Sequence, residues 1–117
     1  RRSTDGVDTE LPHDVVVYRI AGPLLFGAAE RAISSLAQIN DETKAVIISM
    51  DAVPVMDVTG LVALESLLDR LTSARQKALL VGLAKQPREL LEKSKSVKKN
   101  PLVVLCHNIE EALQKCR

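Results

Sequence analysis

Four short apolar runs, each followed by a stretch with helical spacing, constrain the fold of this chain more than any other feature. The runs occupy residues 15–20, 44–49, 78–83 and 102–105 and are rich in valine, isoleucine and leucine. Short continuous runs of this composition are typical of buried strands in a parallel sheet. The alternation predicts an α/β domain of about four mainly parallel strands and about four helices, joined by right-handed crossovers.

Four helices are predicted from apolar residues that recur every three to four positions. They begin near residues 28, 58, 87 and 109 and end near residues 38, 74, 93 and the C-terminus. Pro87 suits the first turn of the third helix, and Asn108 with Glu111 forms a capping-box pattern for the fourth. No helix is expected in the polar stretch 94–100, which ends at Pro101.

The length and composition indicate one domain with a core of its own. The chain has 117 residues, of which 46% are apolar and 26% charged, as in ordinary globular domains. Residues 1–13 are polar, so we expect a lead-in there and the domain itself over residues 14–117. Tyr18 and Phe26 are the only aromatic residues, so the core must be aliphatic.

Several classes of protein are disfavoured by the same numbers. A net charge of +1 with almost no aromatic residues argues against a nucleic-acid partner. Cys106 and Cys116 are too few for a disulfide framework or a zinc site, and we expect reduced thiols. No apolar run approaches the roughly 18 residues of a membrane span, and the start resembles no signal peptide. The chain lacks an initiating Met, so we expect a segment of a longer protein.

An enzyme is not expected, because the sequence holds no complete catalytic set. His13 and His107 have no credible nucleophile beside them, and no glycine-rich phosphate loop is present. Asp51 and Asp57 could hold Mg²⁺ only if a phosphate and waters completed the coordination. Ordinary turn and cap chemistry is the favoured interpretation, and no metal site is predicted.

The loop at residues 50–60 is the candidate site, because ligands usually bind at the carboxyl ends of parallel strands. Asp57 suits the N-cap of the helix that follows, where its carboxylate would accept from free backbone N–H groups. Thr59 would project a hydroxyl at the positive end of that helix, where a phosphate is favoured. The alternative is that Asp57 is only a cap and Thr59 only a first-turn residue.

Two further surfaces have alternative interpretations. Leu24, Leu25 and Phe26 belong either to the core or to an exposed docking patch at the start of a helix. A basic excess around the third helix is either a solvated face or a contact for anionic headgroups or an acidic partner. It comprises Lys85, Arg88, Lys93, Lys95, Lys98 and Lys99, offset only by Glu89 and Glu92.

Two motifs resemble a known family. Residues 57–60 resemble the D-x-[ST]-G signature of STAS domains, which anti-sigma-factor antagonists and sulfate transporters share. Residues 57–65 also resemble the pattern D-x-[ST]-G-x-x-A-L-E of the sulfate permease (SulP) branch. Residues 17–30 resemble the V-Y-R-I-x-G-P-[LF]-F-F-G-A-A-E stretch of the sulfate permease (SulP) branch, with Leu25 where that branch often has Phe. The resemblance covers residue 14 to the end.

The resemblance implies the STAS fold and the cytoplasmic C-terminal domain of a bacterial SulP-type anion transporter at the inner membrane. Substrates in that family include sulfate, bicarbonate and dicarboxylates, and the anion would pass through a membrane domain outside this chain. The STAS domain would regulate transport without transport or catalysis of its own. Its partners would be its own membrane domain and a second copy in a full-length dimer.

Two alternatives stay open. In the antagonist branch the hydroxyl residue of the signature is phosphorylated by a kinase partner, which implies a stand-alone phospho-switch with Thr59 as phospho-acceptor. A second alternative is a nucleotide-sensing module that binds GTP or ATP, since helix N-termini can hold phosphates; otherwise no cofactor is expected. The rim that would bind a nucleotide, an anion or a protein comprises Gly22, Pro23, Leu24, Leu25, Phe26, Gly27, Asp57, Val58, Thr59 and Gly60.

Overall fold

The computed structural model describes residues 11–34 and 42–116. Within these ranges the strands form one four-stranded sheet in the order β1-β2-β3-β4. Every neighbouring pair is parallel, which confirms the prediction made from the alternating pattern. The strands are β1 (Val15–Ala21), β2 (Ala45–Ala52), β3 (Lys77–Val81) and β4 (Val103–Cys106).

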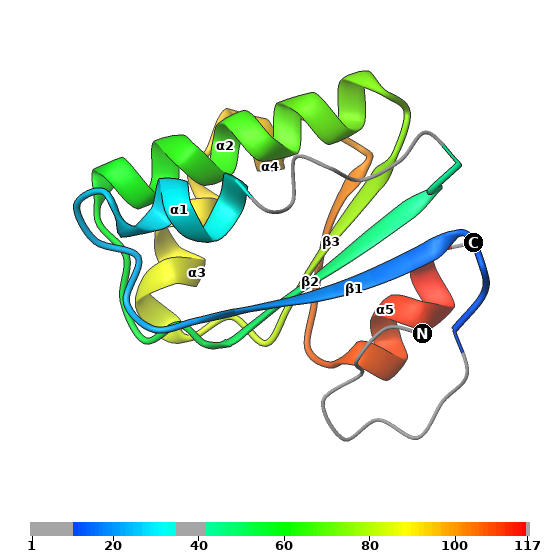
Figure 1. The fold of residues 1–117 in the computed structure, drawn as a ribbon, viewed down its shortest axis with the longest axis horizontal. Coiled ribbons are helices and arrows are strands. Elements are labelled where there is room, and N and C mark those ends of the chain that lie inside the picture. Colours follow the sequence, from blue (N-terminus) through cyan, green and yellow to red (C-terminus); the bar gives the residue numbers. More distant parts are fainter. Residues whose placement is uncertain (1–10, 35–41, 117) are drawn as a thin grey trace.

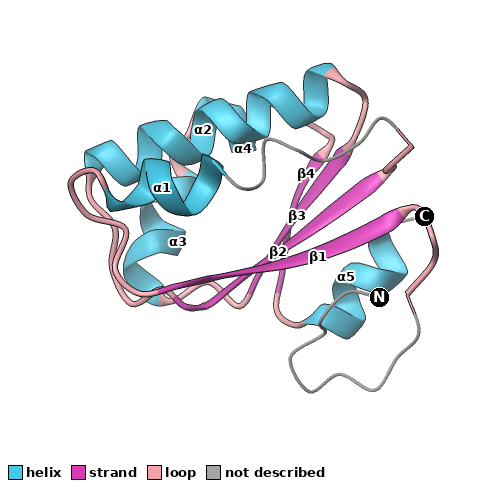
Figure 2. Cartoon of the chain, in the orientation of Figure 1, coloured by secondary structure: helices cyan, strands magenta, loops and turns pink. Residues whose placement is uncertain are grey.

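Helices cover both faces of the sheet (Figure 1). The first four lie on one side and α5 lies alone on the other, and Figure 2 shows the three layers clearly. The helices of the described residues are α1 (Ala28–Ser34), α2 (Val58–Ser73), α3 (Lys85–Glu92), α4 (Lys95–Lys98) and α5 (Ile109–Lys115). None of the helices in these residues is long and apolar enough to cross a bilayer.

The structure corrects the sequence prediction in two places. A short helix, α4, occupies Lys95–Lys98 within the stretch predicted to be without one. Strand β2 runs to Ala52, so the first three residues of the predicted loop 50–60 are strand and the connection to α2 is shorter. The predicted end of the first helix, residues 35–38, lies outside the described residues.

The side chains of β2 alternate between two cores, as the pleat of a strand requires. The larger core lies under α1, α2 and α3, and includes Ile48, Met50, Leu64, Leu67, Leu80 and Leu91. The smaller core lies under α5 and includes Val17, Ile47, Leu79, Cys106 and Ala112. Both are aliphatic, as predicted, and both cysteines are free thiols.

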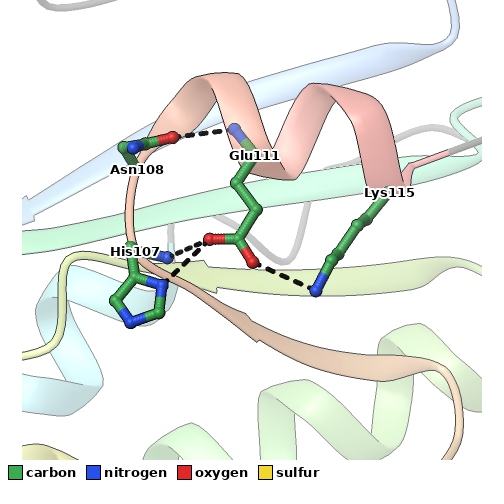
Figure 3. A network of polar contacts seen from close by, with 4 residues as sticks. All are labelled: His107, Asn108, Glu111 and Lys115. Carbon is green, nitrogen blue, oxygen red and sulfur yellow. Dashed lines mark hydrogen bonds and ion pairs between the residues drawn. The ribbon is translucent and has the colours of Figure 1, made fainter.

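A network of four residues fixes the start of α5 (Figure 3). Asn108 accepts from the backbone N–H of Glu111 at 2.8 Å, so the predicted cap is present. Glu111 accepts from the backbone N–H of His107 at 2.7 Å, one residue before the cap, and contacts Lys115 at 3.0 Å. The His107 N–H and then Lys115 lower the pKa of Glu111 to about 2, and the carboxylate raises the pKa of Lys115.

Candidate functional site at the start of α2

Two loops that follow β1 and β2 are joined at the carboxyl end of the sheet. Leu24 and Met56 form an isolated parallel bridge. The Leu24 N–H donates to the Val55 carbonyl at 3.0 Å, and the Asp57 N–H donates to the Leu24 carbonyl at 3.1 Å. Because Leu24 is also buried in the larger core, the bridge anchors the residues on either side of it.

Gly60 allows the first turn of α2 to lie directly on this bridge. A Cβ at Gly60 would stand 2.5 Å from the Leu24 carbonyl oxygen, closer than real side chains approach. Only glycine therefore fits where the helix meets the backbone of the first loop.

Asp57 caps α2, as predicted, and also binds the other loop. Its Oδ1 accepts from the Gly60 N–H at 3.0 Å, and its Oδ2 accepts from the Phe26 N–H at 3.0 Å. These bonds favour the charged carboxylate. The Phe26 N–H, the Thr59 hydroxyl and the Gly60 N–H, in that order of effect, lower the pKa of Asp57 to about 2.

Thr59 completes a small network with the same two residues. Its hydroxyl oxygen lies 2.7 Å from the Phe26 carbonyl oxygen and 2.6 Å from Oδ1 of Asp57. The hydroxyl has a single proton, so it donates to one of these acceptors at a time. Thr59 is exposed, and its hydroxyl is therefore both reachable from solvent and engaged by the protein.

Phe26 is the unusual residue of this network. Its φ of 55° lies in the left-handed region that bulky residues seldom adopt. Its side chain is 79% exposed, although aromatic residues are normally at least partly buried. Asp57 and Thr59 hold the Phe26 backbone on both sides, at its N–H and at its carbonyl. A strained backbone with an exposed ring at such a site suggests a contact role.

A groove of about 630 Å³ runs between α1 and α2 and begins at Thr59. Val58 and Val62 line it and are 67% and 53% exposed. We define Phe26, Val58 and Val62 as the apolar contact surface, because they are the large exposed hydrophobic residues of the described chain. The other residues of the groove are Glu30, Ile33, Ser34, Ala63, Ser66 and Arg70.

The structure divides the predicted rim into supporting and surface residues. Leu24 is buried, Leu25 half-buried and Phe26 exposed, so only the third of these apolar residues is free for contact. Gly22 has a φ of 89° and donates its N–H to the Ala52 carbonyl, which makes it a turn residue. Pro23 and Gly27 are exposed.

Gln86 of α3 is a supporting residue that the sequence analysis missed. Its side-chain amide pairs with the backbone of Met56, accepting from the N–H at 2.9 Å and donating to the carbonyl at 2.8 Å. This pair of hydrogen bonds fixes the loop just before Asp57. A glutamine at the start of a helix gives no signal by itself that it will reach a loop 30 residues away.

Asp51 does not join Asp57 in one site. Its Oδ1 accepts from Ser49 at 3.1 Å and lies 3.4 Å from Nε of Arg19, whereas the contacts of Asp57 are with Phe26, Thr59 and Gly60. In residues 11–34 and 42–116, no three His, Cys, Asp or Glu side chains gather closely enough to hold a metal ion.

Comparison with protein families identifies the class of this domain. A model of the STAS domain family matches residues 6–114. The chain therefore belongs to the STAS domain family, and its network of Asp57, Thr59 and Gly60 is the D-x-[ST]-G signature seen in three dimensions.

Two curated relatives carry transporter names. Over 81 residues the chain is 36% identical to the putative sulfate transporter YvdB of Bacillus subtilis, covering 68% of this chain and 15% of that protein. Over 100 residues it is 32% identical to the bicarbonate transporter BicA of Picosynechococcus, covering 86% of this chain and 18% of that protein. The chain thus spans less than a fifth of the length of either relative.

Solved structures agree with the family. A sulfate transporter family protein from Wolinella succinogenes aligns with a TM-score of 0.81 at 26% identity, covering 97% of this chain and 93% of the other. The STAS domain of a SulP transporter from Vibrio cholerae gives 0.69 at 27% identity, with 89% and 81% covered. A putative anti-sigma factor antagonist from Thermotoga maritima gives 0.71 at 17% identity, with 92% of each chain covered, and shows the shared fold alone. The predicted resemblance to STAS domains of SulP transporters is confirmed.

Proposed function

We propose that this chain is the regulatory domain of a SulP-type anion transporter of the sulfate, bicarbonate or dicarboxylate class. Anion passage belongs to a membrane domain outside the chain, and this domain acts by contact at the cytoplasmic face, without catalysis. The observation that supports this most is identity above 30% to two proteins named as transporters, of which the chain spans less than a fifth. A full-length dimer stays a prediction of the same proposal.

The apolar contact surface is where this domain meets the membrane domain of its own transporter. Phe26, Val58 and Val62 are exposed, and Thr59 links the first of them to the groove that the other two line. Burial of such residues at an interface is favourable by about 25 cal/mol per Å² of apolar surface. The fixed backbone of Phe26 lowers the entropic cost of ordering the contact.

Transport by the full-length protein tests this proposal. We expect Phe26→Glu and Val62→Glu to lower or deregulate anion uptake into vesicles at equal protein level. Gln114→Glu is the matched control, because Gln114 is exposed on α5 across the sheet, and should leave uptake unchanged. A reading frame that encodes no apolar spans upstream of this segment would overturn the proposal, and so would unchanged uptake in both test variants.

A phospho-switch at Thr59 is the second candidate. Its support is the exposed hydroxyl in the first turn of α2, where a phosphate meets a favourable dipole. The Asp57 carboxylate lies 2.6 Å from that hydroxyl oxygen, so a phosphate there would repel Asp57 and release the Phe26 carbonyl. We expect labelling by a cognate kinase with ATP that Thr59→Ser retains and Thr59→Ala abolishes. Absence of labelling with every kinase of the source cell would count against it.

Nucleotide binding at the rim remains a separate prediction. The N–H groups of Phe26 and Gly60 already donate to the Asp57 carboxylate, so a phosphate would have to displace a like charge. Calorimetry with millimolar GTP and ATP is the test. Heat of binding that Asp57→Asn increases would support it, and no heat would remove it.

A further inference from the structure

Four lysines gather in and around α4, which lies behind α2 in the view of Figure 1, whereas α1 lies in front of it. Lys93, Lys95, Lys98 and Lys99 fall within seven residues that contain no acidic residue, although the whole chain has a net charge of only +1. All four are exposed. Arg19 pairs with Asp51, and Glu111 pairs with His107 and Lys115; none of these ion pairs neutralises this lysine face.

Polar contacts hold α4 against α2 at both ends. The Ser94 hydroxyl donates to Oε2 of Glu65 at 2.6 Å and accepts from the Ser96 N–H at 3.2 Å. At the other end, Asn100 donates to the Thr72 hydroxyl at 2.9 Å. Val97 packs against the larger core. The orientation of the lysine face is therefore fixed by the fold.

The spacing within the helix directs the charges to one side. Lys95 and Lys98 lie three residues apart on α4 and share a face of that helix. Lys99 is the C-cap residue, and its N–H donates to the Lys95 carbonyl at 3.2 Å, which keeps it beside them. The acidic groups on the facing side of α2 are Glu65, which is engaged by Ser94, and Asp69, which is exposed on the same face. Neither forms an ion pair with a lysine of α4 within the described residues.

We propose that the lysine face binds the surface of a bilayer that contains anionic phospholipids. Clustered lysines near a charged membrane each contribute to binding without a fixed geometry. A protein partner fits less well, because interfaces are depleted in lysine and enriched in aromatic residues, Met and Arg. The large exposed hydrophobic residues of the described chain lie elsewhere, at Phe26, Val58 and Val62. A single-stranded nucleic acid would need aromatic residues for stacking.

This inference rests on the proposed function in one respect: a transporter domain at the cytoplasmic face lies beside such a bilayer. Vesicle binding is measured on the 117-residue chain alone. Sedimentation with phosphatidylcholine vesicles, with and without phosphatidylglycerol, gives the partition coefficient. We expect binding only to the anionic vesicles, and loss of it at high salt as the screening length falls from about 10 Å at 0.1 M.

Variants locate the binding surface. Lys95→Gln with Lys98→Gln should weaken binding about 25-fold, at about five-fold for each lysine, and the two Lys→Glu changes should reduce it to the level of neutral vesicles. Arg31→Glu with Lys44→Glu is the control of equal charge, since both residues are exposed on α1 and at the start of β2; it should change binding little. Glutamine preserves helix propensity. If the two Lys→Glu changes disturb α4, the result of the two Lys→Gln changes therefore decides the test.

Four outcomes would overturn the inference. The first is that the chain does not bind the anionic vesicles, and the second is that the control and test pairs lose binding equally. The third is that millimolar inorganic phosphate abolishes vesicle binding, and the fourth is that polyglutamate captures the chain although vesicles do not. The third would indicate a free-phosphate site and the last an acidic protein partner. Phe26→Glu should leave vesicle binding unchanged, so failure of the apolar contact surface and failure of the lysine face are distinguishable.

Discussion

The backbone N–H of Phe26 donates to Oδ2 of Asp57 at 3.0 Å, across 31 residues of chain. The other oxygen of the same carboxylate caps α2 through Gly60. One side chain therefore fixes both the start of a 16-residue helix and the backbone of the most exposed aromatic residue. The signature motif therefore holds the apolar contact surface in place, and Thr59 connects Phe26 to the groove that Val58 and Val62 line.

The pKa of Asp57 gives a prediction for acid conditions. In the folded chain it is about 2, against 3.8 for the free side chain, so folding favours the carboxylate. The stability that this provides is fully present above pH 4 and is lost as the pH falls from about 4 toward 2. By NMR, the chemical shift of the Phe26 amide proton should follow the titration of Asp57 with a midpoint near pH 2 in the wild type. In Asp57→Asn the same shift should not change over this pH range. A midpoint near 3.8 would contradict the hydrogen bond.

Glu111 provides the matching control, because its pKa is lowered from 4.5 to about 2 by contacts on the other face of the sheet. Its contribution to stability is lost over the same acid range. Glu111→Gln should therefore flatten part of the fall in melting temperature below pH 4 and leave the Phe26 titration unchanged.

Gly60→Ala should destabilise the domain although alanine is normally the better helix former. The new Cβ would stand 2.5 Å from the Leu24 carbonyl oxygen and 3.1 Å from the Leu24 Cβ, and the Leu24 backbone is paired with Met56 in a bridge that opposes its movement. Overpacking of this kind costs about 1–3 kcal/mol, measured by urea unfolding. Gly27→Ala is the control: its Cβ would meet only Arg31 at 3.8 Å, so we expect no loss.

Features that depend on local sequence were predictable, and features that depend on distant partners were not. Asp57 and Asn108 were identified as caps because a cap bonds to the helix that follows it. Helix α4 was missed because contacts to Glu65 and Thr72 of α2 support it, and a stretch of lysines and serines shows no apolar stripe. The exposure of Phe26 follows from a backbone angle held by Asp57 and Thr59 at the start of α2, which no local pattern contains.

Phe26→Gly and Phe26→Ala separate the strain at this residue from the contact of its ring. Both remove the ring, so both should weaken any partner contact made by the apolar contact surface. The φ of 55° costs alanine about 1–2 kcal/mol and glycine almost nothing. The glycine variant should therefore be about 1 kcal/mol more stable than the alanine variant in urea unfolding. Equal stability of the two would mean that the left-handed backbone at Phe26 is absent in solution.

Arg75 closes α2 in the left-handed conformation, with a φ of 64°. The Gln76 N–H donates to the Leu71 carbonyl at 2.9 Å and the Arg75 N–H to the Thr72 carbonyl at 3.0 Å, the pattern of a Schellman motif. Glycine usually occupies this position, so Arg75→Gly should stabilise the domain by about 1 kcal/mol and raise the melting temperature by roughly 4 °C. Ala74→Gly, one residue earlier at a φ of −87°, should instead lower stability by about 0.5–1 kcal/mol. A general effect of glycine on the unfolded chain would change the stability of both variants in the same direction, so it cannot produce opposite changes at adjacent positions. A loss of stability in both variants would mean that α2 ends differently in solution.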